Sequence, residues 1–292
     1  MGDEQMKIKV PASSANLGPG FDSIGLAVSL YLNVAVKESA KEWQVDHQLG
    51  DLPHDEHNMI VQTALQVAPQ LSPQHLEVSS DIPLTHGLGS SSSAIVAGIE
   101  LANQLANLKL TKAAKVEIAS QIEGHPDNVA PAILGGLVIG TNIDQHFDAV
   151  EAPLPPYDFV TYIPAYSLAT KKARAVLPRQ LDYHSAIHAS AVANTLVAAL
   201  FKQDYSLVSE LMEADNFHEQ YRAQLVPELM PIRQVGHVYG AATYLSGAGP
   251  TVMTMIIPDK TAAFIEALRK KGLSDRIEVL HPDRNGVVVD DQ

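Results

Sequence analysis

Residues 83–94 read Pro83-Leu84-Thr85-His86-Gly87-Leu88-Gly89-Ser90-Ser91-Ser92-Ser93-Ala94 and run directly into an apolar, alanine-rich segment of helical period. The two glycines let the backbone turn tightly and approach a ligand, while the serines offer N-cap oxygens and hydroxyl donors. A helix from about Ser92 to Leu105 would turn its free N–H groups and the positive end of its dipole toward this loop. The stretch predicts a phosphate-binding loop, with a nucleotide as the first ligand to consider. A simple helix cap after a glycine turn is the alternative.

The loop differs from the two best-known phosphate-binding motifs. No Lys-Ser/Thr pair follows the glycines, so the lysine of a Walker A loop is missing. The Gly-x-Gly-x-x-Gly pattern of dinucleotide-binding folds is missing as well. If phosphate binds here, backbone amides, hydroxyl groups and a metal ion must neutralise its charge.

Composition limits the classes of protein to consider. A chain of 292 residues, 46% hydrophobic and 18% charged, is typical of a globular protein with room for two domains. Its net charge of -13 argues against nucleic acid or an anionic membrane as a partner. The complete lack of cysteine excludes disulfides, thiolate catalysis and thiolate metal sites.

The sequence also bears on localisation. The chain opens Met1-Gly2-Asp3-Glu4, without the basic and then apolar pattern of a secretory signal. The most apolar helical segment, Ala186–Leu200, is short for a membrane span and contains His188 and Asn194. We therefore expect a core helix there, no membrane partner and a cytoplasmic protein.

Strand-like and helix-like patterns alternate along the chain without a regular repeat, which predicts an α+β protein. A proline-rich stretch at residues 153–156 marks a change of composition, and we place a domain boundary there. Residues 12–22 between the first two strands are expected to form a glycine-proline loop. The expected strands are 7–11, 26–36, 76–80, 159–163, 241–245 and 251–257 with two short ones at the end, and the expected helices are 58–67, 92–105, 111–122, 185–201, 206–212 and 260–271.

Three glycine-containing loops stand out, at residues 16–22, 87–93 and 246–251. Together they resemble the three motifs of the GHMP kinases, the small-molecule kinase superfamily of galacto-, homoserine, mevalonate and phosphomevalonate kinases. The second loop alone is typical of the whole superfamily. Two other stretches resemble the homoserine kinases specifically: Pro11-Ala12-Ser13-Ser14-Ala15-Asn16-Leu17-Gly18-Pro19-Gly20-Phe21-Asp22 and Glu123-Gly124-His125-Pro126-Asp127-Asn128-Val129-Ala130-Pro131.

The resemblance covers nearly the whole chain and implies both a fold and a reaction. Residues 1–152 would form a nucleotide-binding domain like the second domain of ribosomal protein S5, and residues 153–292 a ferredoxin-like GHMP kinase domain. The reaction implied is phosphorylation of the side-chain hydroxyl of L-homoserine by ATP with Mg²⁺, on the route to threonine. The resemblance leaves a homodimer open.

Roles for individual residues follow from the same resemblance. Ser91 and Glu123 would serve the magnesium ion, and Asn128 would orient the attacking hydroxyl. Homoserine would be held by Asn16, Asp22, His125, Thr170, Arg174 and Arg222. ATP would contact Asn58 and the loop residues Pro83, Leu84, Thr85, His86, Gly87, Leu88, Gly89, Ser90, Ser91, Ser92 and Ser93.

The chemistry of these residue types suits a zwitterionic amino alcohol, because a carboxylate pairs with an ammonium group and arginine forks pair with a carboxylate. Each residue also has an ordinary structural interpretation. Ser91 could only cap a helix, Asn16 and Asp22 could make local turns, and an arginine is more often a surface residue in an ion pair. Glu117, nearly two helical turns before Glu123, is the rival for the metal-side glutamate.

The mechanism has two versions at this stage. Asn128 cannot accept a proton, so positioning and electrostatics would carry the phosphoryl transfer. Asp127 is adjacent and could instead be a general base, which is typically worth about 10²–10⁴-fold. The rival functions are another GHMP kinase, acting on mevalonate, a sugar or an isoprenoid precursor, and a nucleotide-binding regulator without turnover.

Overall fold

Alternating apolar residues near the start of the chain form the antiparallel pair β1 (Met6–Ala15) and β2 (Ile24–Ser39). The structure is a computed structural model and describes residues 6–291. The pairing register shifts between Pro11 and Ala12, and β1 then continues to Ala15, paired with residues 25–28. Residues 12–15 were expected in a loop, and that expectation is wrong. Their small side chains fit a buried strand that passes directly beneath the phosphate loop, where the Ser13 amide donates to Leu88 O at 3.2 Å.

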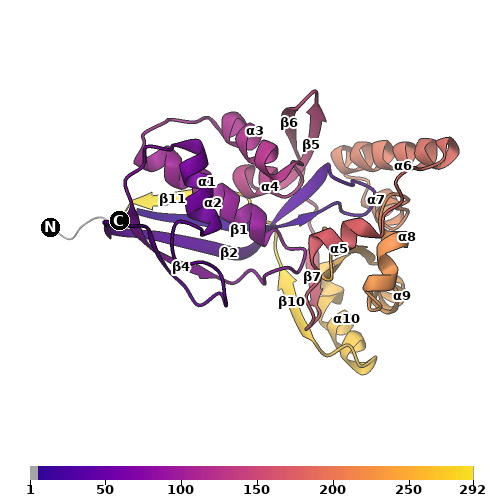
Figure 1. Ribbon diagram of the computed structural model, residues 1–292. Coiled ribbons are helices and arrows are strands. Elements are labelled where there is room, and N and C mark those ends of the chain that lie inside the picture. The colour runs from indigo at the N-terminus through magenta and orange to yellow at the C-terminus, as the bar shows by residue number, and fades with distance from the viewer. Residues whose placement is uncertain (1–5, 292) are drawn as a thin grey trace.

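Seven strands make the first sheet, in the order β11-β1-β2-β4-β3, with β5 pairing β2 and β6. Figure 1 shows helices gathered over one face of this sheet. α2 contacts β1 and β2 as well as α1, α3 and α4, so it lies at the centre of this layer. The remaining elements are β3 (Gln44–Asp46), α1 (Met59–Val67), β4 (Gln74–Ser80), α2 (Ser90–Leu105), α3 (Lys112–Glu123), α4 (Val129–Leu134), β5 (Leu137–Ile143), β6 (His146–Ala152) and β11 (Val288–Asp291).

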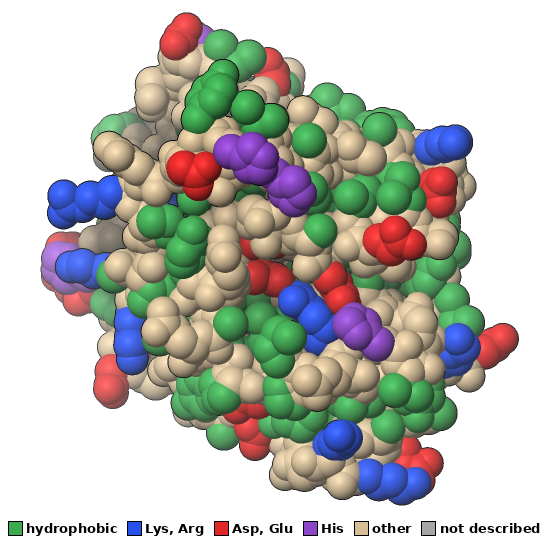
Figure 2. Space-filling view, turned by 90° about the vertical axis from the view of Figure 1, so that its right-hand side faces the viewer, with side chains coloured by type: hydrophobic (Ala, Val, Ile, Leu, Met, Phe, Trp, Pro, Cys, Tyr) green, Lys and Arg blue, Asp and Glu red, His purple; other side chains and the backbone are tan. Residues whose placement is uncertain are grey.

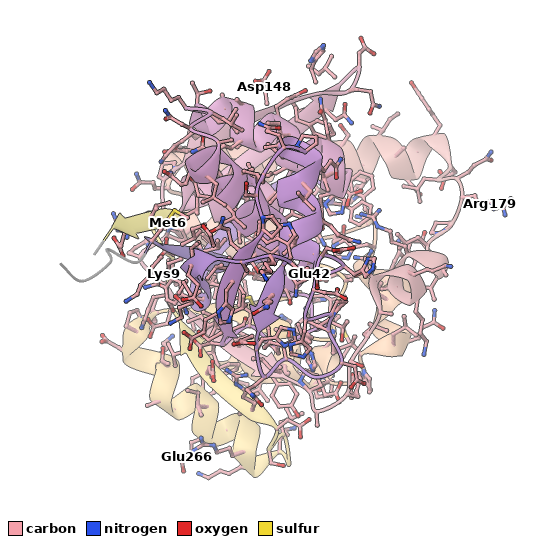
Figure 3. The ribbon with its side chains drawn as sticks, turned by 60° about the vertical axis from the view of Figure 1, so that its left-hand side comes forward. Met6, Lys9, Glu42, Asp148, Arg179 and Glu266 are labelled. Carbon is pink, nitrogen blue, oxygen red and sulfur yellow. The ribbon has the colours of Figure 1, made fainter. Side chains whose placement is uncertain are left out.

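The last strand returns to the beginning of the chain. β11 pairs antiparallel with β1, Met6 opposite Asp291 and Lys9 opposite Val288. Figure 3 shows the labelled Met6 and Lys9 beside this strand, with Asp148 and Glu266 toward opposite ends of the molecule. The division of the chain at residues 152 and 153 stays a prediction, but its final strand contributes to the first sheet.

Four antiparallel strands make the second sheet, in the order β10-β7-β9-β8. With α9 and α10 as the two helices that pack on it, this is the β-α-β-β-α-β arrangement of ferredoxin-like domains, so the expected α+β class is confirmed. α9 and α10 pack on this sheet around a core that includes Val160, Phe264 and Leu268. The elements are β7 (Asp158–Ile163), α5 (Thr170–Ala175), α6 (Tyr183–Lys202), α7 (Tyr205–Met212), α8 (Glu219–Arg222), the 3₁₀ turn Ala223–Leu225, α9 (Leu229–Tyr239), β8 (Ala242–Leu245), β9 (Val252–Ile256), α10 (Pro258–Lys270) and β10 (Arg276–Leu280).

α6 differs from the core helix expected from its composition. It is 20 residues long, with a mean hydropathy of 1.2 over its apolar window, but only 22% of that window is buried. One stripe that includes Leu196 and Leu200 packs inward, whereas Tyr183 and Ile187 are exposed. Length and composition alone would allow this helix to cross a membrane, but one such helix is weak evidence for a membrane span.

A buried ion pair joins α2 to α3 in the helical layer. Glu100 is 2% exposed, and its carboxylate accepts hydrogen bonds from Lys115 Nζ at 2.5 Å and from the Asn103 and Gln104 amides. Burial opposes ionisation of Glu100, but these donors outweigh it and hold its pKa below the usual value. The carboxylate therefore stabilises the folded state above its unfolded pKa, and this contribution is lost as the pH falls through its folded pKa.

Replacing Lys115 by methionine should lower the free energy of unfolding at pH 8 by about 3 kcal/mol, because a buried carboxylate loses its counter-ion. The deficit should shrink at pH 5, where the stranded carboxyl can take up a proton and become neutral. Urea denaturation at both pH values measures this difference. Lys112→Met, at an exposed site on the same helix, is the control and should change little. A deficit independent of pH would contradict the prediction.

Candidate active site

The three glycine-containing loops meet at a cleft of about 500 Å³. It lies between the helical layer of the first sheet and α5 and α8 of the second half. The lining includes residues from the first loop (Asn16, Phe21, Asp22), from the phosphate loop (Leu84, Thr85, His86, Gly87, Gly89, Ser90, Ser91, Ser92), from the α3–α4 turn (Glu123, His125, Asp127, Asn128) and from the second half (Thr170, Arg174, Arg222, Gly247, Ala248). The sequence motifs therefore converge in space.

The N-terminus of α2 opens into the cleft without a side-chain cap. Gly89 occupies the cap position in the left-handed conformation, and within residues 6–291 no side chain bonds the first amides of the helix. By contrast, Asn58, Thr111, Asp182 and Asp204 cap their own helices with side-chain oxygens. Free amides at a helix N-terminus bind anions, so this end of α2 is suited to the phosphates of a nucleotide.

A buried hydroxyl network holds the phosphate loop against the third glycine loop. Ser246 Oγ donates to Gly87 O at 2.7 Å and lies 2.8 Å from Ser14 Oγ, which in turn lies 3.0 Å from the hydroxyl of Tyr244. Burial raises the pKa of Tyr244, so its phenol stays protonated and able to donate. The network links β1, β8 and the phosphate loop, and therefore fixes the loop relative to the second half of the chain.

Gly87→Ala should raise the KM for ATP about 5- to 30-fold. Gly87 has φ +73°, and a Cβ there would fall on the carbonyl oxygen of Ser246. The left-handed conformation alone costs a side chain about 1–2 kcal/mol. Gly272→Ala is the matched control, because Gly272 has φ +83° with nothing described within 4 Å of a Cβ. Steady-state kinetics with varied ATP gives both values, and equal effects of the two changes would contradict the argument.

Glu123, rather than its rival Glu117, reaches the cleft. Glu123 ends α3 beside the phosphate loop, and its Oε1 accepts from Ser92 Oγ at 3.0 Å. Burial raises its pKa, so a cation would compensate an otherwise costly charge. Glu117 instead accepts from the Phe147 amide and holds the β5–β6 hairpin. Ser91 lies at the cleft, with its Oγ 3.2 Å from Met59 Sδ.

An apolar slot borders the phosphate loop on the α1 side. It is lined by Leu32, Leu49, Leu52, Pro53, His57, Met59, Ile60 and Val78, which the sequence did not single out. Asn58 also lines it, but Oδ1 of its amide caps α1 through the Ile60 amide and Nδ2 donates to Pro53 O. Asn58 thus shapes the slot through these bonds, and its contact with adenine stays a prediction.

Asp22 and Arg174 form an ion pair across the cleft. The Arg174 nitrogens Nη1 and Nη2 donate to the two Asp22 oxygens at 3.2 and 2.8 Å. Asp22 sits at φ 54°, where its amide donates to Asn16 Oδ1, while Asn16 Nδ2 donates to Gly247 O. The Asn16 side chain therefore aims Asp22 into the cleft. The sequence analysis matched the Asp22 carboxylate to the substrate ammonium group and the Arg174 guanidinium to the substrate carboxylate. In the structure these two side chains pair with each other.

Arg222 lies beneath this ion pair and is almost fully buried, at 2% exposure. Nε donates to Ala173 O, and Nη1 donates to Gly247 O and lies 3.2 Å from His218 Nδ1. Among residues 6–291, Nη2 has no recorded hydrogen-bond partner. Burial lowers the pKa of Arg222 to about 10, with a smaller contribution from the nearby Arg174 charge, so Arg222 is still a cation at neutral pH. A buried cation with a free donor at a cleft is suited to an anion.

Phe21 is a site residue that the sequence analysis missed. The guanidinium groups of Arg174 and Arg222 lie 5.7 and 5.2 Å from its ring centroid, and the His218 ring stacks on it at 5.2 Å. Cation–π contacts at such distances hold a guanidinium group in place. Its position beside Asp22 in the first loop was the available signal, but nothing local shows that two distant arginines converge on it.

His125, Asp127 and Asn128 form the floor opposite the arginines. His125 Nδ1 lies 2.5 Å from Asp127 Oδ1, and Asn128 Oδ1 accepts from Ser13 Oγ at 3.0 Å. Burial opposes a charge on His125, but the Asp127 carboxylate outweighs burial and raises its pKa. Potential metal-binding atoms of Asp22, His125 and Asp127 lie within 4.8 Å of one another. The Asp22 oxygens already accept from Arg174 and His125 Nδ1 faces Asp127, which counts against a metal ion here. The two carboxylates of the cluster are suited to an ammonium group.

The remaining predicted residues divide between the cleft and its support. Thr170 begins α5 and lines the cleft. Three predicted loop residues do not line the cleft: Pro83, Leu88 and Ser93. Leu88 is buried in the core, and Ser93 Oγ donates to Ser90 O.

On the face drawn in Figure 2, basic side chains are interspersed with acidic ones rather than gathered in a broad basic surface.

Comparisons with known proteins identify the family of this chain. The family described as GHMP kinases N terminal domain matches residues 58–136, and the one described as GHMP kinases C terminal matches residues 196–273. The chain is 61% identical to the homoserine kinase of Lactobacillus acidophilus, covering 97% of this chain and 99% of that protein. It is 64% identical to the homoserine kinase of Limosilactobacillus fermentum, covering 97% and 100%.

Solved structures extend the likeness. The homoserine kinase of Cytophaga hutchinsonii has a TM-score of 0.87 and 28% identity, covering 99% of this chain and 98% of that chain. The mevalonate kinase of L. major has a TM-score of 0.71 at 20% identity, covering 94% of both chains, and at that identity it shows a shared fold alone. From its motifs, its cleft and these relatives, the chain belongs to the homoserine kinase family of the GHMP kinases.

Proposed function

We infer that this chain phosphorylates the side-chain hydroxyl of L-homoserine with ATP, giving O-phospho-L-homoserine and ADP. The observation that carries this function is the placement, in one cleft, of an uncapped helix N-terminus and a set of charged side chains complementary to an amino acid. The uncapped end of α2 suits phosphate, and Asp22, Arg174 and Arg222 suit an ammonium and a carboxylate group. Two relatives that are more than 60% identical and are named homoserine kinase support the same reaction.

A divalent cation fits the same cleft. We propose Mg²⁺ beside the phosphate loop, held by Glu123 and the Ser91 hydroxyl, because a buried carboxylate with a raised pKa adjoins the amides that would take the phosphates. When bound, such an ion neutralises charge on the phosphate oxygens. The free α2 amides and the dipole of α2 would stabilise the same charge.

The attacking hydroxyl would lie near Asn128. The Asn128 amide is oriented by Ser13, and it can hold a hydroxyl but cannot accept its proton. The hydroxyl would therefore be positioned, and its proton would pass late in the transfer to an oxygen of the transferred phosphate, unless Asp127 takes it. Asp127 is buried at 3% exposure and already engaged by His125, which limits its access to the hydroxyl. We therefore favour the mechanism without a general base.

The other GHMP kinases remain the alternative, and they are less supported because mevalonate and sugars lack the paired ammonium and carboxylate groups. We propose a cytoplasmic protein without a nucleic-acid or membrane partner, because its net charge of -13 would repel both of these anionic partners. We propose a homodimer on family likeness alone.

A coupled assay of ADP release with homoserine, mevalonate or galactose tests the function. We expect turnover with homoserine at least 100-fold above that with either other substrate. Turnover with mevalonate or galactose at the rate of homoserine would reject the proposal. ADP release without dependence on any of them would instead indicate a nucleotide-binding protein of another class.

A further inference from the structure

We propose that the Asp22–Arg174 ion pair is a selectivity device that a zwitterionic amino acid opens by exchanging both partners at once, an inference that rests on the proposed function. The ammonium group of the ligand would replace Arg174 beside Asp22, and its carboxylate would replace Asp22 beside Arg174. A ligand that carries only one of these charges would leave the other side chain unpaired.

The ion pair closes the part of the cleft where the ligand would lie. Asp22 belongs to the loop after β1, whereas Arg174 lies on α5 of the second half, 152 residues later. Both side chains line the cleft. They are 36% and 40% exposed, so the pair is not locked into the core. An ion pair of this exposure shifts an equilibrium by only about two- to fivefold, so a ligand can open it.

Each member of the pair faces a like charge as soon as its partner leaves. Arg222 lies on the same Phe21 ring as Arg174, and both guanidinium groups are cations. On the other side, an Asp22 oxygen lies within 4.8 Å of both the carboxylate of Asp127 and the ring of His125. Opening the pair without compensation therefore leaves Arg174 beside a second cation, and leaves Asp22 without a counter-ion beside the hydrogen-bonded Asp127–His125 pair.

A zwitterion compensates both side chains together. Its ammonium group would sit between Asp22 and Asp127, and its carboxylate between Arg174 and Arg222. The Nη2 group of Arg222, without a recorded partner in the described part of the chain, supplies a donor for that carboxylate. A singly charged amino alcohol or hydroxy acid can meet only half of this arrangement, which makes charge balance rather than shape the basis of selection.

The test uses three ligands that share the reacting hydroxyl: L-homoserine, 3-aminopropan-1-ol, which lacks the carboxylate, and 4-hydroxybutanoate, which lacks the ammonium group. Dissociation constants are measured by ligand-observed NMR on the full chain and on its Asp22→Asn and Arg174→Gln variants. Affinity for ATP is measured first, because it reports whether each variant keeps its fold. Arg276→Gln, which removes an exposed ion pair with Glu278 on the second sheet, is the control.

Both variants should bind L-homoserine at least tenfold more weakly than the unaltered chain. The decisive results are gains: Asp22→Asn should bind 4-hydroxybutanoate two- to fivefold more tightly, because Arg174 no longer has a partner to release. By the same reasoning, Arg174→Gln should bind 3-aminopropan-1-ol two- to fivefold more tightly. Arg276→Gln should change none of the three affinities.

Unchanged or weaker binding of both singly charged ligands to their variants would overturn the exchange. A gain in only one variant would overturn it as well, because the exchange requires both charges to be released. These outcomes are separate from the fate of the proposed function. If the unaltered chain fails to phosphorylate homoserine, the function is wrong, whereas turnover of homoserine without the two gains rejects the selectivity device alone.

Discussion

Arg222→Met should reduce kcat/KM for homoserine by about 10²- to 10³-fold. The substitution would leave the substrate carboxylate in the cleft without its buried counter-ion, and breaking such a pair by removing one partner costs about 3–4 kcal/mol, which corresponds to a loss of that size. Methionine is flexible and fills much of the arginine volume, so a cavity contributes little to the loss. The KM for ATP should change by less than about threefold, because the arginine lies on the amino-acid side of the cleft.

Two further variants separate recognition from architecture. Arg222→Lys keeps the charge but loses the planar fork, so its effect should be intermediate, at about tenfold or more. Arg179→Met is the control, since Arg179 is exposed in the connection between α5 and α6, well away from the helical layer in Figure 3. Steady-state kinetics with each substrate varied in turn measures the loss toward ATP and the loss toward homoserine separately. An equal loss toward ATP and homoserine would assign Arg222 to holding Ala173 and Gly247 in place, rather than to binding the substrate.

The neighbours of Arg222 fix the position of α8, the short helix that carries it. Asp215 holds the entry to α8 by accepting from the amides of Phe217, His218 and Glu219. Glu219 accepts from the Leu245 amide at 2.6 Å and from Arg233 Nη2 at 2.6 Å, which ties α8 to the edge strand β8. The short helix thus has a fixed position, and that position carries Arg222 into the cleft. The rigidity matters because a displaced Arg222 would no longer direct its Nη2 group at the substrate carboxylate.

Local sequence signals were sufficient for the three glycine loops and for most regular elements. The expected helix at residues 58–67 and the strand at 76–80 lie within a few residues of α1 and β4, because periodic apolar residues and a capping Asn58 define them. α9 was missed, since Pro231 and Gly236 interrupt its helical pattern. β6 was missed because most of its residues are exposed and show little alternation.

The site itself was predictable in its composition but not in its internal contacts. Motif positions identify Asp22, Arg174 and Arg222 as charged residues of one site, yet their spacing along the chain does not show which charges pair with one another. The Asp22–Arg174 pair and the shared ring of Phe21 depend on how α5 and α8 pack against the first loop. Pairing of β11 with β1 is similarly a long-range outcome that no short pattern encodes.

Glu123→Gln should lower kcat by about 10³-fold or more while leaving the affinity for homoserine nearly unchanged. The substitution keeps size and shape but removes the charge that would hold a divalent cation, and stabilisation of transferring phosphate by such an ion is worth several kcal/mol. The apparent affinity for Mg²⁺, measured by titration in the presence of ADP, should fall in parallel. That binding measurement separates loss of the ion from loss of the fold.

Glu117→Gln is a closely matched control, because it makes the same change on the same helix. Glu117 accepts from the Phe147 amide at 2.7 Å, and a glutamine carbonyl can still accept that bond. Activity and Mg²⁺ affinity should therefore stay within about twofold of the unaltered chain. Loss of both in Glu117→Gln together with their retention in Glu123→Gln would exchange the two roles. Such a result would require the end of α3 to rotate away from the phosphate loop, breaking the Ser92–Glu123 hydrogen bond.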